Sequence, residues 1–498
     1  MTRWLGAFLL VVTLSGAAAA AADERPAAGS KPPELPAHVE TRHTLNLGGR
    51  SLNYEAIAET LPLTDSKGEQ TASIFTVAYV AEHPAGEPRP VSFIFNGGPG
   101  AASVFLHLGA IGPSVIEVSP DGAVPTPPVR FADNPSTWLP FTDLVFVDPV
   151  GTGFSRALGK GDNPDKPFWD VHGDIRSLEA AMRLWLTRHQ RWASPIFLVG
   201  ESYGGFRVAA MSNSVERDVG IVPRGLVMIS PALDLSVIHS DSRDLVASAV
   251  ELPSEAAAAA ALTGKTDDAA AVERFALADY LVGLAALKGR LAPGDPFIGR
   301  VAKIVGLRED TVRRNRGRVP ARVFAREIRR NEGEIVSIYD ATVERATTGE
   351  SGGDDAGDPV LDTAVATFTQ AFEAYAPKEL GYRTDQPYRV LPRDVSQHWN
   401  WQEAHVGGLG LALSSLESAL LQHPGMKALV VNGRYDLVTP YLGSRWLIDQ
   451  LAVPDAVRQD IRVRVYEGGH MMYLRPASRA ALAQDAAELF SAANAASQ

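Results

Sequence analysis

A serine stands between glycines in the stretch VGESYGG, residues 199–205, directly after the apolar run PIFL. A strand, a Gly-x-Ser-x-Gly turn and a following helix make up a nucleophile elbow, in which the tight turn lifts the serine hydroxyl above a sheet. Ser202 is therefore a candidate nucleophile. The pentapeptide alone is equally consistent with an ordinary glycine-rich turn. Glu201, an ionisable residue directly before the serine, also needs a chemical explanation.

A serine hydroxyl needs a base to become a good nucleophile, and the base needs an acidic partner that fixes its tautomer. Asp436 follows the apolar run ALVVN, and His470 follows the run IRVRVY. Serine, acid, histidine is the chain order of the triad in α/β hydrolases, and the carboxyl ends of strands are where open α/β sheets place their sites. We predict that Ser202, Asp436 and His470 form a catalytic triad.

An acyl intermediate also needs hydrogen-bond donors for its oxyanion. The loop NGGPG, residues 96–100, follows the apolar run VSFIF, where an α/β hydrolase offers one backbone amide; the residue after the nucleophile, Tyr203, offers the second. Glycine lets the backbone of such a loop approach closely. A phosphate-binding loop is a poor alternative because no GKS or GKT follows. No metal or cofactor is implied.

The pattern of apolar runs predicts the fold class. Short β-rich runs with little alternation occur at residues 143–148, 195–200, 225–230, 428–432 and 461–466. Such runs suit strands that are covered on both faces, and a helical pattern at residues 170–192 separates two of them. The sequence therefore predicts a mainly parallel sheet in an α/β-hydrolase fold. From Thr41 the pattern alternates and predicts a hairpin that turns at Gly48 and Gly49.

Residues 233–400 do not continue this alternation of strand and helix patterns. They contain an alanine run at residues 256–261, a long helical pattern at residues 266–290 and an arginine-dense section at residues 308–330. We predict a mostly helical cap insertion. Acidic residues are interleaved with the arginines, which favours a salt-bridged, solvated face over an anion site. Residues 41–232 and 401–498 are then the two parts of the α/β-hydrolase core.

The N-terminal residues MTRWLGAFLLVVTLSGAAAAAADE combine Arg3, a short apolar run and small residues suited to cleavage. This pattern is typical of a secretory signal, and the apolar run is too short for a membrane anchor. We predict a signal peptide at residues 1–22, a proline-rich linker at residues 23–40, and an exported protein that is periplasmic or secreted, with no stable membrane anchor.

Length, charge and cysteine content limit the classes of partner and the sources of stability that we expect. The chain has 498 residues, no cysteine and a formal net charge of −11. That length is enough for one large core with an insertion or for two domains. The acidic balance argues against nucleic acid as a partner and favours peptides or small soluble substrates. Without cysteine, no disulfide contributes to stability.

The motifs FNGGPGAAS, DLVFVDPVGTGFSRA, VGESYGG, NGRYDLVTP and GGHMM together resemble the serine carboxypeptidases. The resemblance implies an α/β hydrolase that releases C-terminal amino acids from peptides through an acyl-enzyme. It also implies that Asn96, Gly97 and Glu201 bind the C-terminal carboxylate of the substrate, while Gly98 and Tyr203 form the oxyanion hole. Two buried carboxylates repel strongly unless one is protonated, so this role of Glu201 favours acidic pH.

The sequence departs from the family pattern at three places. Where the family has a second glutamate in an ELGP-like stretch, this chain has AIGP with Ala110, so the proton-sharing glutamate pair is absent. The strength of carboxylate binding and of the acid preference is therefore open. The family's Cys-Ser-Ser after GGPG is Ala-Ala-Ser here, and its Val-Pro after His-Met is Met472-Tyr473.

Two other functions remain open. The first is another acyl-group enzyme on the same fold: an aminopeptidase of the proline iminopeptidase type, which also carries GGPG, an esterase or an acyltransferase. Asn96 and Glu201 argue against it, because an enzyme that binds an N-terminal amine does not need that pair facing the leaving group. The second is a catalytically silent binding protein, against which the intact Ser202, Asp436 and His470 argue.

Overall fold

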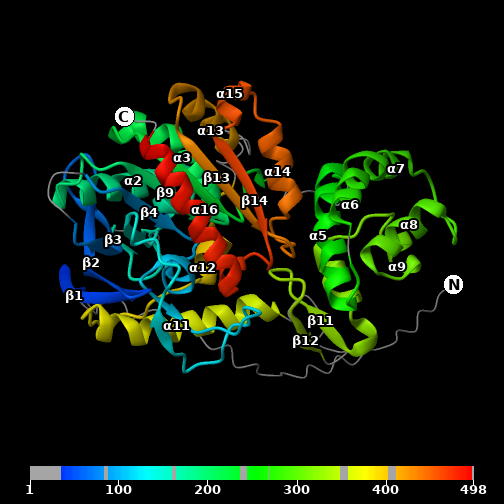
Figure 1. The fold of residues 1–498 in the computed structure, drawn as a ribbon, viewed down its shortest axis with the longest axis horizontal. Coiled ribbons are helices and arrows are strands. Elements are labelled where there is room, and N and C mark those ends of the chain that lie inside the picture. Colours follow the sequence, from blue (N-terminus) through cyan, green and yellow to red (C-terminus); the bar gives the residue numbers. More distant parts are fainter. Residues whose placement is uncertain are drawn as a thin grey trace, which may run out of the picture. The chain divides into compact units, whose positions relative to one another are not determined.

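The structure, a computed structural model, describes residues 35–83, 88–159, 164–235, 244–266, 268–347, 357–401 and 411–495 (Figure 1). The predicted signal peptide and most of the predicted linker lie outside the described residues. The end of that linker is corrected: the first strand already begins at His38, because residues 38–40 pair in register with Glu59, Ala58 and Ile57 of the next strand.

In the described part of the chain, ten strands form one sheet, in the order β1-β2-β3-β7-β4-β9-β10-β13-β14 with β8 paired to β3. Neighbours from β7 to β14 are parallel, whereas β1, β2, β3 and β7 are antiparallel. The strands are β1 (His38–Leu47), β2 (Arg50–Thr64), β3 (Gln70–Ala81), β4 (Val91–Phe95), β7 (Asp143–Val147), β8 (Arg156–Ala157), β9 (Ile196–Glu201), β10 (Pro223–Ile229), β13 (Lys427–Gly433) and β14 (Ile461–Tyr466).

The central strands are apolar throughout because both of their faces are covered. In β9, Phe197 and Val199 join the core on one face, while Ile196 and Leu198 join the core on the other. The first face is covered by α11 (Pro359–Glu379) and α16 (Pro476–Ala495), and the second by α2 (Val171–Arg188), α3 (Tyr203–Val219) and α13 (Leu411–Gln422). This layered, mainly parallel sheet is the predicted α/β-hydrolase fold.

A third core lies among the helices that follow β10. These helices, drawn in green in Figure 1, are α5 (Leu245–Thr263), α6 (Ala269–Phe275), η3 (Ala276–Tyr280), α7 (Leu281–Ala286), α8 (Pro296–Val305), α9 (Glu309–Arg314) and α10 (Ala321–Glu327). Among the described helices, α5 is long and apolar enough to cross a membrane by length and composition alone, but most of it is buried in this core. The α14 helix (Tyr441–Asp449) packs against α5 and shares the core.

Two details concern the predicted cap. The α11 helix falls inside the predicted range 233–400, yet its buried residues Phe368 and Phe372 belong to the core under the sheet rather than to the third core.

The arginine-dense section does form ion pairs: Arg308 and Arg330 with Glu327, and Arg313 with Asp310. The predicted salt-bridged helical face is therefore confirmed.

Short elements complete the described chain. They are α1 (Val104–Leu106), η1 (His107–Ile111), β5 (Ser114–Ile116), β6 (Phe131–Asp133), η2 (Lys166–Phe168), η4 (Arg330–Glu332), β11 (Glu334–Val336), β12 (Glu344–Ala346), α12 (Arg393–His398), α15 (Asp455–Arg458) and η6 (Met472–Leu474). Of these, η1 and η6 pack against one another beside the site described below.

Candidate active site

Ser202 occupies a sharp turn between β9 and α3, with a positive φ of 60°. The turn depends on glycines that let backbone segments touch. A Cβ on Gly200 would lie 2.0 Å from the carbonyl oxygen of Gly204, and a Cβ on Gly204 would lie 2.6 Å from that of Phe95. Real Cβ atoms do not approach so closely, so this strand-to-helix turn has the geometry of a nucleophile elbow.

The end of β10 holds the elbow in place. The amide of Ser202 donates to the carbonyl of Ile229 at 2.9 Å, and its own carbonyl accepts from the amide of Ala232 at 3.0 Å. A non-glycine residue at positive φ is unfavourable and persists only where its surroundings fix it. These backbone bonds supply that constraint.

His470 and Asp436 are paired beyond the ends of β14 and β13. Nδ1 of His470 lies 2.8 Å from Oδ2 of Asp436, and both residues are buried. The other carboxylate oxygen, Oδ1, accepts from the amides of Val438 and Thr439 at 2.7 and 3.0 Å. The pair fixes the imidazole so that Nε2 is left for the reacting side.

Thr439 contacts both members of this pair, a role that was not predicted from the sequence. Its hydroxyl donates to Oδ2 of Asp436 at 2.7 Å and lies 3.1 Å from Nδ1 of His470. A threonine three residues after the acid in GRYDLVTP is the only trace of this role in the sequence. Thr439, which contacts both members of the Asp436–His470 pair, therefore helps to fix their relative position.

Electrostatics favour the charged form of His470. Burial lowers the pKa of His470, but the charge and hydrogen bond of Asp436, together with the charge of Glu201, outweigh burial and raise it to about 8. No hydrogen bond among the described residues joins the imidazole to the Ser202 hydroxyl; instead Nε2 lies 3.7 Å from Oε1 of Glu201. Catalytic hydrogen bonds are often long before substrate is bound.

Glu201 and Asn96 form a buried pair next to the serine. Nδ2 of Asn96 donates to Oε2 of Glu201 at 2.9 Å, while Oδ1 of Asn96 accepts from the amide of Leu106 at 3.0 Å. Burial is the main cause that raises the pKa of Glu201, and the charge of Asp436 adds to it; His470, Asn96 and the Gly97 amide oppose the rise. The carboxyl is thus shifted toward its neutral form.

The NGGPG loop touches the elbow directly. A Cβ on Gly97 would lie 2.5 Å from the amide nitrogen of Tyr203 and 2.7 Å from the carbonyl oxygen of Glu201. Gly98 follows with a φ of 98°, a conformation that favours glycine. Tyr203 is the first residue of α3, where backbone N–H groups have no partner within the helix. The Tyr203 amide is therefore an available donor beside the serine, and Gly98 follows directly after the glycine that packs against the elbow.

The structure brings all the predicted site residues to one end of the sheet. Asn96 and Gly97 contact the elbow, Gly98 follows Gly97 in the same loop, and Glu201 lies near His470 of the Asp436–His470 pair.

A buried arginine supports the site from beneath and was not predicted. Nε of Arg207 lies 2.5 Å from Oδ2 of Asp174, with both side chains buried, and Nη1 donates to the carbonyl of Asn96. The guanidinium also lies 4.9 Å from the ring centre of Tyr203. A charged residue inside the apolar stretch FRVAAM of the helix after the serine was the signal that could have found it.

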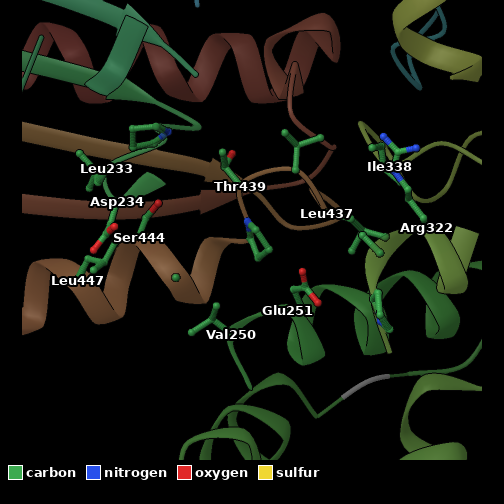
Figure 2. Close-up of a pocket in the computed structure, with 16 residues that line it drawn as sticks. Leu233, Asp234, Val250, Glu251, Arg322, Ile338, Leu437, Thr439, Ser444 and Leu447 are labelled. Carbon is green, nitrogen blue, oxygen red and sulfur yellow. The ribbon is translucent and has the colours of Figure 1, made fainter. Parts of the chain in front are cut away.

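A cavity of about 510 Å³ adjoins the acid side of the site (Figure 2). Leu437 and Thr439 line it from the loop after β13, and Val250 and Glu251 line it from α5. Burial raises the pKa of Glu251 to about 8. Because Thr439 also contacts Asp436, the cavity adjoins the loop that carries this aspartate.

Sequence comparison shows similarity to one peptidase family. Residues 63–220 match the family model described as Serine carboxypeptidase. The chain is similar to Serine carboxypeptidase-like 2 of Arabidopsis thaliana, with 28% identity over 163 residues that make up 31% of this chain and 35% of that protein. It is also similar to Serine carboxypeptidase-like 15 of the same plant, with 29% identity over 135 residues, or 26% and 28% of the two chains.

Solved structures show a weaker likeness. A protein described as Lipase (Open form) is 14% identical, with a TM-score of 0.36 over 88% of this chain and 99% of that chain. The strand order and the helical layers on both faces of the sheet show the fold. The alignments span about a third of the length of the curated relatives. Within this chain, the segment that matches the serine carboxypeptidase model, residues 63–220, includes both the NGGPG loop and the serine elbow.

Proposed function

We propose that this protein is a serine-type carboxypeptidase that releases C-terminal amino acids from peptides through an acyl-enzyme. The observation that carries the proposal is the buried Asn96–Glu201 pair directly beside Ser202. Acyl transfer alone needs the serine, the base, the acid and two oxyanion donors. A carboxyl group on the leaving-group side, held by an amide and shifted toward its neutral form, adds a site that suits a substrate carboxylate.

In the first half of the reaction, the Ser202 hydroxyl attacks the carbonyl carbon of the last peptide bond while Nε2 of His470 takes the hydroxyl proton. Asp436 stabilises the imidazolium that forms. The amides of Gly98 and Tyr203 donate to the oxyanion of the tetrahedral intermediate. His470 then gives its proton to the departing amine, the C–N bond breaks and the acyl chain remains on Ser202.

In the second half, water takes the place of the amine. His470 removes a proton from the water as it attacks the ester carbon, and then returns that proton to the Ser202 oxygen as the acyl bond breaks. The products are the shortened peptide and one free amino acid. Thr439, which contacts both Asp436 and His470, keeps the ring in one orientation through both halves.

Recognition of the C-terminus falls to Asn96, Gly97 and Glu201. The protonated carboxyl of Glu201 donates to the substrate carboxylate, because two ionised carboxyl groups in a buried site would repel. Binding of peptides therefore favours acidic pH. With Ala110 in place of a second carboxyl group, burial and Asp436 supply the upward shift of the Glu201 pKa.

We further propose that residues 1–22 are a signal peptide, that the protein is exported, and that its partners are peptide substrates rather than nucleic acid. The N-terminal charge and apolar run support export. Mass spectrometry of the N-terminus of the protein purified from its source tests this: a chain that still begins at Met1 would contradict export by cleavage.

The main alternative is another acyl-group enzyme on this fold, such as a proline iminopeptidase-type aminopeptidase, an esterase or an acyltransferase. The deciding experiment uses a blocked dipeptide with a free C-terminus and the same dipeptide with an amidated C-terminus. We expect rapid hydrolysis of the free acid and, on longer peptides, a mass-spectrometric ladder of single losses from the C-terminus. Release of the first N-terminal residue would instead identify an aminopeptidase. Ser202→Ala is the negative control.

A further inference from the structure

A buried tyrosine beside the candidate site carries a hydroxyl that the mechanism above leaves unused. Tyr473 belongs to η6, close after His470 in the chain, and is fully buried. Its hydroxyl makes no hydrogen bond of good geometry to any described residue, although the side chains of Asn96 and Glu201 lie close enough to interact with it. A buried donor without a partner costs about 1–3 kcal/mol, so such groups are uncommon unless a ligand or a function satisfies them.

The polar neighbours of this hydroxyl are Asn96 and Glu201. Burial, followed by the negative charge of Glu201, raises the pKa of Tyr473 well above its ordinary value, and the side chain of Asn96 opposes that rise. The hydroxyl therefore remains protonated. It is a neutral donor next to the amide and the carboxyl that form the site's other polar groups.

The packing around Tyr473 fixes this position. Its turn, η6, packs against η1, where a Cβ on Gly109 would lie 3.4 Å from Cδ2 of Leu474. The same η1 turn contains Ala110, and it follows α1, whose Leu106 amide binds the side chain of Asn96. Asn96 and the two turns therefore form one wall, to which Ala110 contributes only a methyl group. Tyr473 supplies the polar group.

We infer that the hydroxyl of Tyr473 donates a hydrogen bond to the C-terminal carboxylate of the substrate, beside Asn96 and Glu201. This inference rests on the proposed function. A carboxylate has two oxygens with about four acceptor sites, so it accommodates a further donor. Because the phenol donates without first taking up a proton, it contributes to binding whether or not Glu201 is ionised.

The test removes only the hydroxyl. Tyr473→Phe keeps the buried ring, and Tyr280→Phe is a matched control, since its hydroxyl donates to the Gly317 carbonyl at 2.9 Å inside the third core. We expect Tyr473→Phe to lower kcat/KM for the free-acid dipeptide by about tenfold or more, as for a hydrogen bond to a charged group. For the amidated dipeptide, kcat/KM of Tyr473→Phe should stay within about twofold of wild type. Tyr280→Phe should leave kcat/KM unchanged for both dipeptides.

Thermal unfolding separates this role from a structural one. Removing a buried hydroxyl that makes no hydrogen bond of good geometry within the described part of the chain should leave the melting temperature of Tyr473→Phe unchanged or higher. In contrast, Tyr280→Phe loses a made hydrogen bond and should melt lower. Equal losses on the free acid and the amide, or no loss on either, would overturn the inference while leaving the carboxypeptidase proposal standing.

A binding measurement keeps the inference testable even if the proposed function fails. In a Ser202→Ala background, calorimetric titration with an N-blocked amino acid, a product-like carboxylate, should show about tenfold weaker binding for Tyr473→Phe. Wild type without carboxypeptidase activity would remove the proposed function alone. Unchanged affinity of Tyr473→Phe, or no binding of the N-blocked amino acid by the Ser202→Ala protein itself, would remove the inference.

Discussion

Nε2 of His470 lies 3.7 Å from Oε1 of Glu201, and both side chains are buried. The negative charge of Glu201 helps to raise the pKa of His470, while His470 opposes the rise in the pKa of Glu201. The group that would hold the substrate carboxylate and the group that would act as base therefore titrate as a coupled pair. A change at either one alters the pH response of the other.

Glu201→Gln should lower the pKa of His470, because it removes a nearby negative charge that favours the imidazolium. The base must be neutral to accept the serine proton, so the acid limb of kcat/KM on a C-terminal ester or amide should move to lower pH. Profiles from about pH 5 to about pH 9, with NMR titration of the imidazole, measure the shift. Superimposable acid limbs for wild type and variant would mean that the two groups are not coupled.

The free-acid substrate should respond differently to the same Glu201→Gln substitution. In wild type, the apparent affinity for peptides should fall as pH rises through the pKa of Glu201, since the ionised carboxylate must take up a proton before it donates. Glutamine stays neutral and still donates, which should flatten the alkaline side of the peptide profile. Parallel profiles of wild type and variant on the peptide and its amide would exclude Glu201 from carboxylate recognition.

Ser202→Ala and His470→Ala should each lower kcat by several orders of magnitude, because triad residues act as a unit. Asp436→Asn should cost about 10⁴-fold through loss of tautomer control. Peptide hydrolysis by purified, folded variants measures these losses, and chelators should leave the wild-type rate intact. The triad assignment is wrong if Ser202→Ala keeps more than about a tenth of the wild-type rate.

Gly200→Ala should destabilise the protein by about 3 kcal/mol, since the new Cβ meets backbone atoms that cannot move aside. Gly443→Ala is the matched control: it lies in α14, and its Cβ would meet Val250 at an ordinary 3.4 Å. Replacing that helical glycine should stabilise the protein by about 0.5–1 kcal/mol. Chemical denaturation followed by circular dichroism compares the two. Equal stability of Gly200→Ala and wild type would contradict the close-packed elbow.

Glu251→Gln should make stability less dependent on pH. Burial raises the pKa of Glu251 from 4.5 to about 8, so the folded state keeps a proton that the unfolded state releases, and stability falls as pH rises through that window. The variant should therefore gain more in melting temperature near the upper end of this window than near its lower end. Glu255, in the same helix and also with a raised pKa, leaves a residual slope. Exposed Glu69→Gln is the control; equal gains across the window would contradict the shift.

The sequence predicted what depends on local pattern and chain order. The strands β9, β10, β13 and β14 follow from apolar runs buried on both faces, and the carboxyl ends of those strands place Ser202, Asp436 and His470 together. The roles of Arg207 and Tyr473 were not predicted because they depend on tertiary neighbours. The partners of Arg207, for example, are Asp174 and the Asn96 carbonyl. Nothing in the local sequence of α11 distinguishes a helix under the sheet from a cap helix.

The loop that carries Asp436 has a further consequence for protein engineering. Its immediate neighbours Tyr435 and Leu437 are buried in the third core, among the helices α5 to α10. The helices and the loop that carries Asp436 thus share one core, so the helices cannot be exchanged independently of that loop. Grafting a different lid onto this scaffold to alter its selectivity would have to reproduce the contacts of both side chains, or the acid would lose its alignment with the imidazole. Libraries for directed evolution should therefore leave Tyr435, Leu437 and the helical residues that contact them unchanged.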